Sequence, residues 1–182
     1  MRTTGPCTMG ILMMILVLTT GIKCSSDNNG EGGSNSLQEY IFSIDETYKH
    51  DSSAFTQGLV IENGELYEST GLYGQSGIRK VDLKTGDVLF QHEISDTVFG
   101  EGLTHFDGKL IQLTWKSGEV NVFSEKKSSF SRDKDSEFKI SGEGWGLTND
   151  GKYLIMSDGS DAIYFLDPKT QKVDHSISVR MD

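Results

Sequence analysis

Cysteine is almost absent from this sequence, and the little there is lies near the start. The 182 residues include two cysteines, Cys7 and Cys24. Everything after Cys24 is therefore free of internal disulfides and of thiol nucleophiles. The four histidines are scattered along the chain, at His50, His92, His105 and His175. Because no two of them have the paired spacing of zinc ligands, the sequence predicts no metal site, and we expect no cofactor.

Positive charge is also scarce. Lysine and arginine together number 17 against 27 aspartates and glutamates, which gives a formal net charge of −10. An acidic chain is repelled by phosphate backbones and by anionic lipid surfaces. The composition therefore argues against nucleic acid and against an anionic membrane face as partners.

A hydrophobic run long enough to cross a bilayer is missing as well. The apolar segment Ile11–Leu18 is eight residues long, whereas a membrane-spanning helix needs about 20. Such a segment is typical of a secretory signal peptide. Cys24 follows it and precedes a polar, glycine-rich run, an order that resembles bacterial lipoprotein leaders, in which Cys24 would be lipidated. Lys23 stands where those leaders carry a small residue, so a simple exported protein is the alternative.

These features divide the chain into a signal peptide at 1–24, a flexible linker at 25–37 and one domain at 38–182. We expect an exported protein, located in the periplasm or held at the cell envelope as a lipoprotein. The expected contact with a membrane is limited to a lipid anchor at Cys24.

What the domain does contain is a repeat. Gly-Leu steps occur at Gly58, Gly102 and Gly146, and both intervals are 44 residues. Each step closes a related motif: Phe55–Leu59, Phe99–Leu103 and Glu143–Leu147. An unvarying period makes Gln57, Glu101 and Trp145 equivalent positions in three copies of one unit.

Short strands separated by turn signals fill each copy. The predicted strands are Gly58–Ile61, Glu65–Ser69, Ile78–Asp82, Val88–Ile94, Gly102–His105, Lys109–Thr114, Glu119–Phe123, Glu137–Ile140, Gly146–Thr148, Tyr153–Ser157, Ala162–Leu166 and Val173–Val179. Four short strands per unit at this period are the signature of a β-propeller blade. A β-sandwich would not repeat at 44 residues. The sequence therefore predicts an all-β fold, a partial β-propeller.

The predicted propeller has about three blades and one extra strand. Tyr40–Ile44 is predicted to be a strand with Tyr40, Phe42 and Ile44 on one face, as a closing outer strand would be, and the charge-rich stretch Glu125–Asp135 is predicted to be a solvated loop. Propellers close with about four to eight blades. We therefore expect the remaining blades to lie beyond Asp182, with assembly of several copies into a ring as the alternative.

Equivalent positions at the start of the innermost strands lie around one opening of a propeller. Gln57, Glu101 and Trp145 occupy those positions, and the glycine after each lets the backbones crowd near the axis. Trp115 falls where the other copies have Gly71 and Gly159. Phe55 and Phe99 are also equivalent. One carboxylate among aromatic side chains is what proton transfer on a small neutral substrate requires, although each residue taken singly is also compatible with packing.

The motifs Phe55–Leu59, Phe99–Leu103, Leu113–Trp115 and Gly144–Leu147 closely resemble those of the glutamine cyclotransferases, the plant-type glutaminyl-peptide cyclotransferases that also occur in bacteria. The resemblance implies a five-bladed propeller that converts the N-terminal glutamine of peptides or proteins to pyroglutamate with loss of ammonia, without a catalytic metal. It implies an active site formed by Glu101, Gln57, Phe55, Phe99, Trp115 and Trp145. The family pattern continues with an asparagine and a lysine in the last two blades, beyond the end of this chain.

The expected chemistry assigns Glu101 as general base and then general acid, and the other five residues as substrate-binding. Glu101 would accept the proton of the substrate amine and return it to the leaving nitrogen. An indole N–H of Trp115 or Trp145 would donate to the carbonyl oxygen. The competing hypothesis is a non-catalytic exported propeller that binds peptides or proteins.

Overall fold

A computed structural model describes residues 41–180 of the chain, and within them all regular structure is β-strand. The strands of the first sheet are β1 (Thr56–Glu62), β2 (Glu65–Thr70), β3 (Gly77–Val81) and β4 (Val88–Glu93). Those of the second are β5 (Gly100–Phe106), β6 (Lys109–Thr114), β7 (Glu119–Lys126), β8 (Ser129–Arg132) and the short β9 (Phe138–Lys139). Those of the third are β10 (Leu147–Asn149), β11 (Leu154–Ser157), β12 (Ala162–Asp167) and β13 (Lys172–Ser178).

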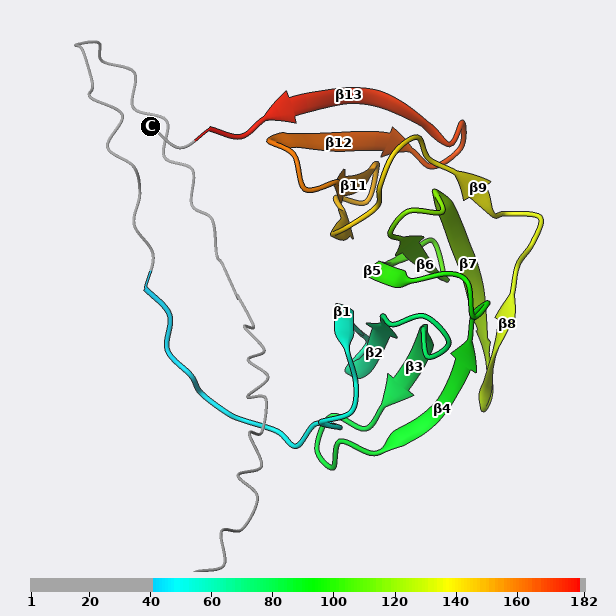
Figure 1. Ribbon diagram of the computed structural model, residues 1–182. Helices are drawn as coiled ribbons and strands as arrows, with labels where there is room; N and C mark the ends of the chain where they lie inside the picture. The colour runs from blue at the N-terminus through cyan, green and yellow to red at the C-terminus, as the bar shows by residue number, and fades with distance from the viewer. Residues whose placement is uncertain (1–40, 181–182) are drawn as a thin grey trace, which may run out of the picture.

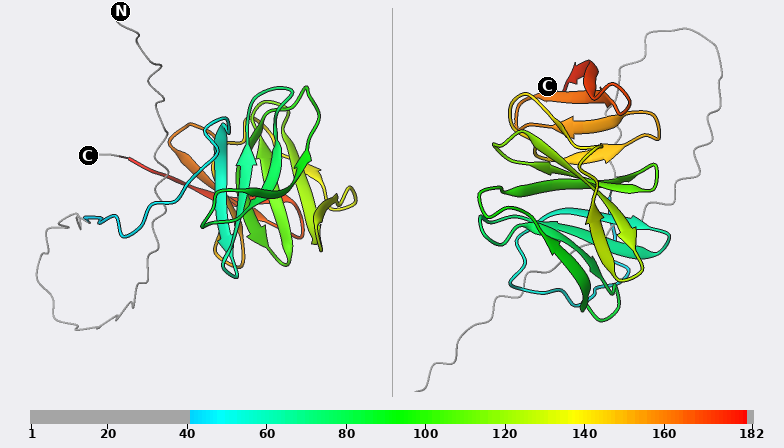
Figure 2. Two further views of the ribbon diagram at one scale, coloured as in Figure 1. Left: turned by 90° about the horizontal axis from the view of Figure 1, so that it is seen from below. Right: turned by 90° about the vertical axis from the view of Figure 1, so that its right-hand side faces the viewer.

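The three sheets are antiparallel and radiate from a common centre (Figure 1). The strand orders are β1-β2-β3-β4, β5-β6-β7-β8 with β9 paired to β7, and β10-β11-β12-β13. The first strand of each sheet is innermost and the fourth is outermost (Figure 1). Seen from the side, the sheets stack face to face, the second between the other two (Figure 2).

Apolar side chains on both faces of the middle sheet pack against the two outer sheets and hold the stack together. Along β6, Leu110 points toward the first sheet and Ile111 toward the third, as a period of two requires. The first interface buries Tyr67, Ile78, Ile94, Val98, Leu103, Leu110, Phe123 and Phe130. The second buries Ile111, Leu113, Val120, Leu154, Met156 and Leu166. The middle sheet is thus apolar on both faces.

The turns follow their sequence signals. Asn63 and Gly64 both have positive φ, 52° and 81°, as a two-residue hairpin turn between twisted strands needs. Asp82 Oδ1 accepts hydrogen bonds from the backbone N–H groups of Lys84 and Thr85, at 2.9 and 2.8 Å. Asp167 caps the corresponding turn of the third sheet from Oδ1 in the same way.

The repeated glycines lie where neighbouring inner strands come into contact. A Cβ on Gly58 would lie 2.5 Å from the backbone nitrogen of Leu103 on β5. A Cβ on Gly102 would lie 2.5 Å from the backbone nitrogen of Leu147 on β10. Gly102 N–H also donates to the carbonyl of Trp145 at 2.8 Å. Glycine is therefore required at these two positions by the close approach of backbone.

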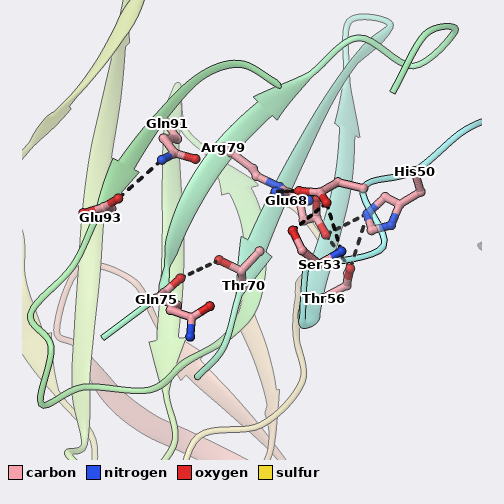
Figure 3. A network of polar contacts seen from close by, with 10 residues as sticks. His50, Ser53, Thr56, Glu68, Thr70, Gln75, Arg79, Gln91 and Glu93 are labelled. Carbon is pink, nitrogen blue, oxygen red and sulfur yellow. Dashed lines mark hydrogen bonds and ion pairs between the residues drawn. The ribbon is translucent and has the colours of Figure 1, made fainter. Parts of the chain in front are cut away.

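A network of polar side chains anchors the segment that leads into β1 (Figure 3). Glu68 on β2 is fully buried. It accepts a hydrogen bond from Arg79 Nε at 2.7 Å and another from the Thr56 hydroxyl, and it lies 3.0 Å from His50 Nε2. Arg79 also contacts Asp51 at 2.9 Å. Because Thr56 begins β1, this network fixes the strand that carries Gln57.

Two predictions about strands are wrong. Residues 41–44 form no strand, and Ile41, Phe42 and Ile44 are exposed; within the described chain no neighbouring strand pairs with them, and a strand exists only through such pairing. The stretch Glu125–Asp135 is not a loop. It contains the end of β7 and the whole of β8, because Phe130 is buried against Tyr67 and Phe90 while its polar neighbours face water.

Several expectations fall outside the described residues. They are the signal peptide at 1–24 with lipidation at Cys24, the linker at 25–37, and Tyr40 at the head of the leading strand. Among residues 41–180, no helix is long and apolar enough to cross a membrane.

Candidate functional site

Gln57 and Glu101 meet at the ends of adjacent inner strands. The Gln57 side-chain amide Nε2 donates to Glu101 Oε2 at 2.7 Å. The two residues lie at the starts of β1 and β5, which are neighbours because their glycines allow close approach. Both side chains are half-buried. The structure thus brings together two residues that are 44 positions apart in the sequence.

Aromatic rings form a wall around this pair. The Phe99 ring makes edge contacts with Phe55 (6.0 Å between centroids), with Tyr73 (5.6 Å) and with Trp115 (5.7 Å). Trp115 follows β6 directly, and its backbone N–H donates to the carbonyl of Phe99 at 3.0 Å. Phe55 is 49% exposed. The wall therefore borders solvent, as the mouth of a binding site does.

The two tryptophans share one partner, Glu143. Its Oε2 accepts the indole N–H of Trp115 at 2.7 Å and that of Trp145 at 3.0 Å. A backbone hydrogen bond from Gly144 N–H to the Trp115 carbonyl, 3.1 Å long, brings the segments together. All six sequence-predicted residues therefore lie at one end of the inner strands, and sequence reasoning missed Glu143 and Tyr73. The available signal for Glu143 was its position, since the other two copies have phenylalanine there.

Glycines make room for two of these rings. A Cβ on Gly71 would lie 2.6 Å from Phe99 Cζ, and a Cβ on Gly159 would lie 2.7 Å from Trp145 Cζ2. Gly71 and Gly159 are the positions equivalent to Trp115. In each copy, therefore, this loop position either supplies a ring or leaves space for one.

The two carboxylates of the site have opposite pKa shifts. Burial raises the pKa of Glu101 above its ordinary value, and the nearby charge of Glu143 acts in the same direction against the hydrogen bond from Gln57. The indole hydrogen bonds from Trp145 and Trp115 lower the pKa of Glu143. Environments that separate two pKa values in this way assign different roles to the two groups. Glu101 is suited to exchange a proton, and Glu143 to remain an anion.

One sizeable cavity lies elsewhere. It measures about 680 Å³ and is bordered by turns that include Asp107 and Gly151, past the opposite end of β5 from Glu101. None of the six predicted site residues lines it. A smaller cavity of about 260 Å³ is lined by Phe55 and Gly71 together with other residues of the first sheet and its loops. Across residues 41–180, no group of three or more His, Cys, Asp or Glu side chains is placed to hold a metal ion. The chemistry of the side chains, not cavity size, therefore identifies the site.

The fold places the chain in a class of all-β proteins with propeller-like relatives. The described structure is similar to that of the Pan2 WD40 domain of Neurospora crassa, with a TM-score of 0.54 at 10% identity, over 68% of this chain and 36% of that one. It is more similar to the glutaminyl cyclase of Myxococcus xanthus, with a TM-score of 0.65 at 32% identity, over 73% of this chain and 54% of that one.

The sequence defines the family. The glutamine cyclotransferase profile matches residues 13–182, and the chain belongs to this family. A glutaminyl-peptide cyclotransferase of Arabidopsis thaliana is 42% identical over 134 residues. That match covers 73% of this chain and 41% of the plant protein. The chain thus spans about two fifths of its plant relative and about half of the bacterial enzyme.

Proposed function

We propose that this chain is a glutaminyl-peptide cyclotransferase in which Glu101 acts as general base and then as general acid. The reaction converts an N-terminal glutamine of a peptide or protein to pyroglutamate and releases ammonia. The observation that carries the proposal is Glu101 itself: a half-buried carboxylate with a raised pKa, hydrogen-bonded by Gln57 beside an aromatic wall. Family membership supports the same reaction.

The substrate's own amine is the nucleophile. The α-amino nitrogen attacks the side-chain carbonyl carbon, a C–N bond forms, and the bond to the amide nitrogen breaks as ammonia leaves. Because both groups belong to one residue, a pocket that holds the folded-back conformer supplies much of the rate. Peptide amines have pKa values near ~8, so part of the substrate is already the neutral nucleophile at mild pH.

Glu101 moves one proton through this sequence. It accepts the proton that the amine loses on attack and returns it to the departing nitrogen, so that no proton is gained or lost overall. Gln57 holds Oε2 at 2.7 Å, and among the described residues no donor contacts Oε1. Oε1 is therefore the oxygen available to the substrate. Phe55, Phe99, Trp115 and Trp145 would hold and shield the glutamine side chain.

Mass spectrometry of a glutamine-initiated peptide incubated with the full chain tests this reaction. We expect loss of ammonia faster than in the buffer control, and none from the same peptide with an acetylated amine, because acetylation removes the nucleophile. Circular dichroism on the same sample shows whether the sheets are formed. A folded protein that leaves the free-amine peptide unchanged would contradict the proposal.

The alternative is an exported propeller that binds peptides without turning them over. The half-exposed aromatic residues Phe55 and Trp145, at 49% and 45%, are compatible with either function. Calorimetric binding of the glutamine-initiated peptide without ammonia release would favour the binding module. For either function we propose export through residues 1–24, with a lipid anchor at Cys24.

A further inference from the structure

Glu143 contacts both tryptophans of the chain through a single oxygen. The sequence contains two tryptophans, Trp115 and Trp145. Both indole N–H groups end on Glu143 Oε2, at 2.7 and 3.0 Å. The rings come from different sheets, since Trp115 follows β6 and Trp145 precedes β10. Glu143 therefore joins the second and third sheets where the site opens.

The charges that face Glu143 come from several segments. Lys116 Nζ lies 4.0 Å from the centroid of the Trp115 ring and attracts the Glu143 carboxylate. Asp158, in the turn before β12, repels the Glu143 carboxylate. Glu101 on β5 is close enough for the charge of Glu143 to raise its pKa. Among the described residues, the Glu143 side chain accepts hydrogen bonds only from the two indole N–H groups.

An indole has one hydrogen-bond donor and no acceptor. With that donor bonded to Glu143, neither ring has an N–H to offer a substrate oxygen while the bonds hold. What remains available is the face and edge of each ring. A hydrogen bond to a charged acceptor is about twice as strong as one between neutral groups, so Glu143 fixes the orientation of both rings.

We propose that Glu143 is the positioning residue of this site: it clamps Trp115 and Trp145 as walls for the glutamine side chain, and the tryptophans act through their ring faces rather than as donors to the carbonyl oxygen. This inference rests on the proposed function for its substrate. It replaces the sequence-based expectation that an indole N–H stabilises the developing negative charge. The same carboxylate supplies the fixed negative charge beside Glu101.

Tryptophan emission tests the clamp independently of turnover, because both tryptophans of the protein contact Glu143. In Glu143→Ala we expect a shifted emission maximum and stronger acrylamide quenching, since both rings are released. In Glu143→Gln the amide oxygen still accepts a hydrogen bond without charge, so an intermediate change is expected. Glu93→Ala, an exposed residue of the first sheet, is the matched control and should leave emission unchanged.

Acid titration of the wild-type protein gives the same information without a substitution. Because the indole bonds lower the pKa of Glu143, emission should stay constant through the ordinary glutamate range and change below it. The Glu143→Gln variant should lack this transition. This measurement decides the question even if Glu143→Ala does not fold.

Peptide affinity tests the role in substrate binding. For a glutamine-initiated peptide we expect Kd to rise about tenfold in Glu143→Ala, because the two released rings must be ordered again when the peptide binds. Unchanged emission in both variants overturns the clamp. Changed emission with unchanged Kd overturns its role in binding. Absence of ammonia release from the wild type contradicts the proposed function. The clamp is then tested by tryptophan emission alone, which does not depend on turnover.

Discussion

Two glutamates in neighbouring parts of the molecule have opposite surroundings. Glu68 is 0% exposed and is contacted by Arg79, His50 and Thr56. Glu101 is half-buried and, among the described residues, accepts a hydrogen bond from Gln57 only. Both lie on or beside the inner strands of the first two sheets.

The comparison shows what separates a structural carboxylate from a reactive one. A buried charge is tolerated when cations and donors compensate it. The Glu68 carboxylate is fully occupied in holding the start of β1. Glu101 has one neutral donor, its pKa is raised by burial, and one oxygen remains open. Substitutions in the two environments should therefore differ in their effect on stability.

Removal of Glu68 should have the largest effect. Glu68→Ala leaves the Arg79 guanidinium buried without its main partner, which typically costs about 3–5 kcal/mol of unfolding free energy. Urea unfolding followed by circular dichroism measures the loss. The exposed Glu93→Ala serves as control and should change stability by less than about 0.5 kcal/mol. A Glu68→Ala protein as stable as this control would show that the network is not structural.

The repeated glycines should differ among themselves. Gly102→Ala places a methyl group 2.5 Å from the backbone nitrogen of Leu147, and backbone cannot move aside cheaply. We expect a loss of about 1–3 kcal/mol. At Gly146 the nearest atom is the flexible Ser157 hydroxyl oxygen at 3.0 Å, so Gly146→Ala should cost less. Equal melting temperatures for the two variants would contradict the assignment of close strand contact to Gly102.

Asp51 offers a pH-dependent test of the same network. Hydrogen bonds from Ser53, followed by that from Arg79, lower the pKa of Asp51 from 3.8 to about 2. A group whose pKa is lowered by folding stabilises the protein at pH values above its pKa in the unfolded chain. That stabilisation disappears as the pH falls through the pKa in the folded protein. Asp51→Asn should therefore be less stable than wild type at neutral pH, by at most about 1 kcal/mol. The difference should close between pH 3.8 and about 2 in unfolding curves; a constant difference would rule out this ionisation as the cause.

Glu101→Gln should have the smallest effect on stability, and in the opposite direction. Below the ordinary glutamate pKa the carboxyl group is protonated in both folded and unfolded chains, so the variant and wild type should match. As the pH rises through the raised folded pKa, ionisation destabilises the wild type only. The variant should thus be slightly more stable at neutral pH. A variant that is less stable at neutral pH would mean that the Glu101 charge supports the fold.

Much of the fold was predictable because its signals are local. The strand Lys109–Thr114 matches β6 at both ends, and Asn63-Gly64 and Asp82 mark real turns. The strand β8 was missed because its residues are mostly polar, and its one buried anchor, Phe130, shows itself only against the first sheet. The leading strand Tyr40–Ile44 was predicted wrongly for the converse reason. The sequence shows that Tyr40, Phe42 and Ile44 would share one face, but it does not show whether a neighbouring strand pairs with them.

The candidate site was predictable as far as the 44-residue equivalence reaches. That equivalence places Gln57 beside Glu101, and the structure shows them 2.7 Å apart. Glu143 was missed because its importance depends on the orientation of two indole rings, which sequence spacing does not specify. The signal for Glu143 in the sequence is that the equivalent positions of the other two copies are phenylalanine, Phe55 and Phe99.

The most direct test measures ammonia release and thermal unfolding on one preparation of Glu101→Gln. We expect the melting temperature to be kept or slightly raised, while ammonia release from a glutamine-initiated peptide falls about 10²–10⁴-fold, the usual contribution of a general acid–base group. Peptide binding should survive the substitution. Turnover at the wild-type rate by the folded variant would contradict the assignment of proton transfer to Glu101.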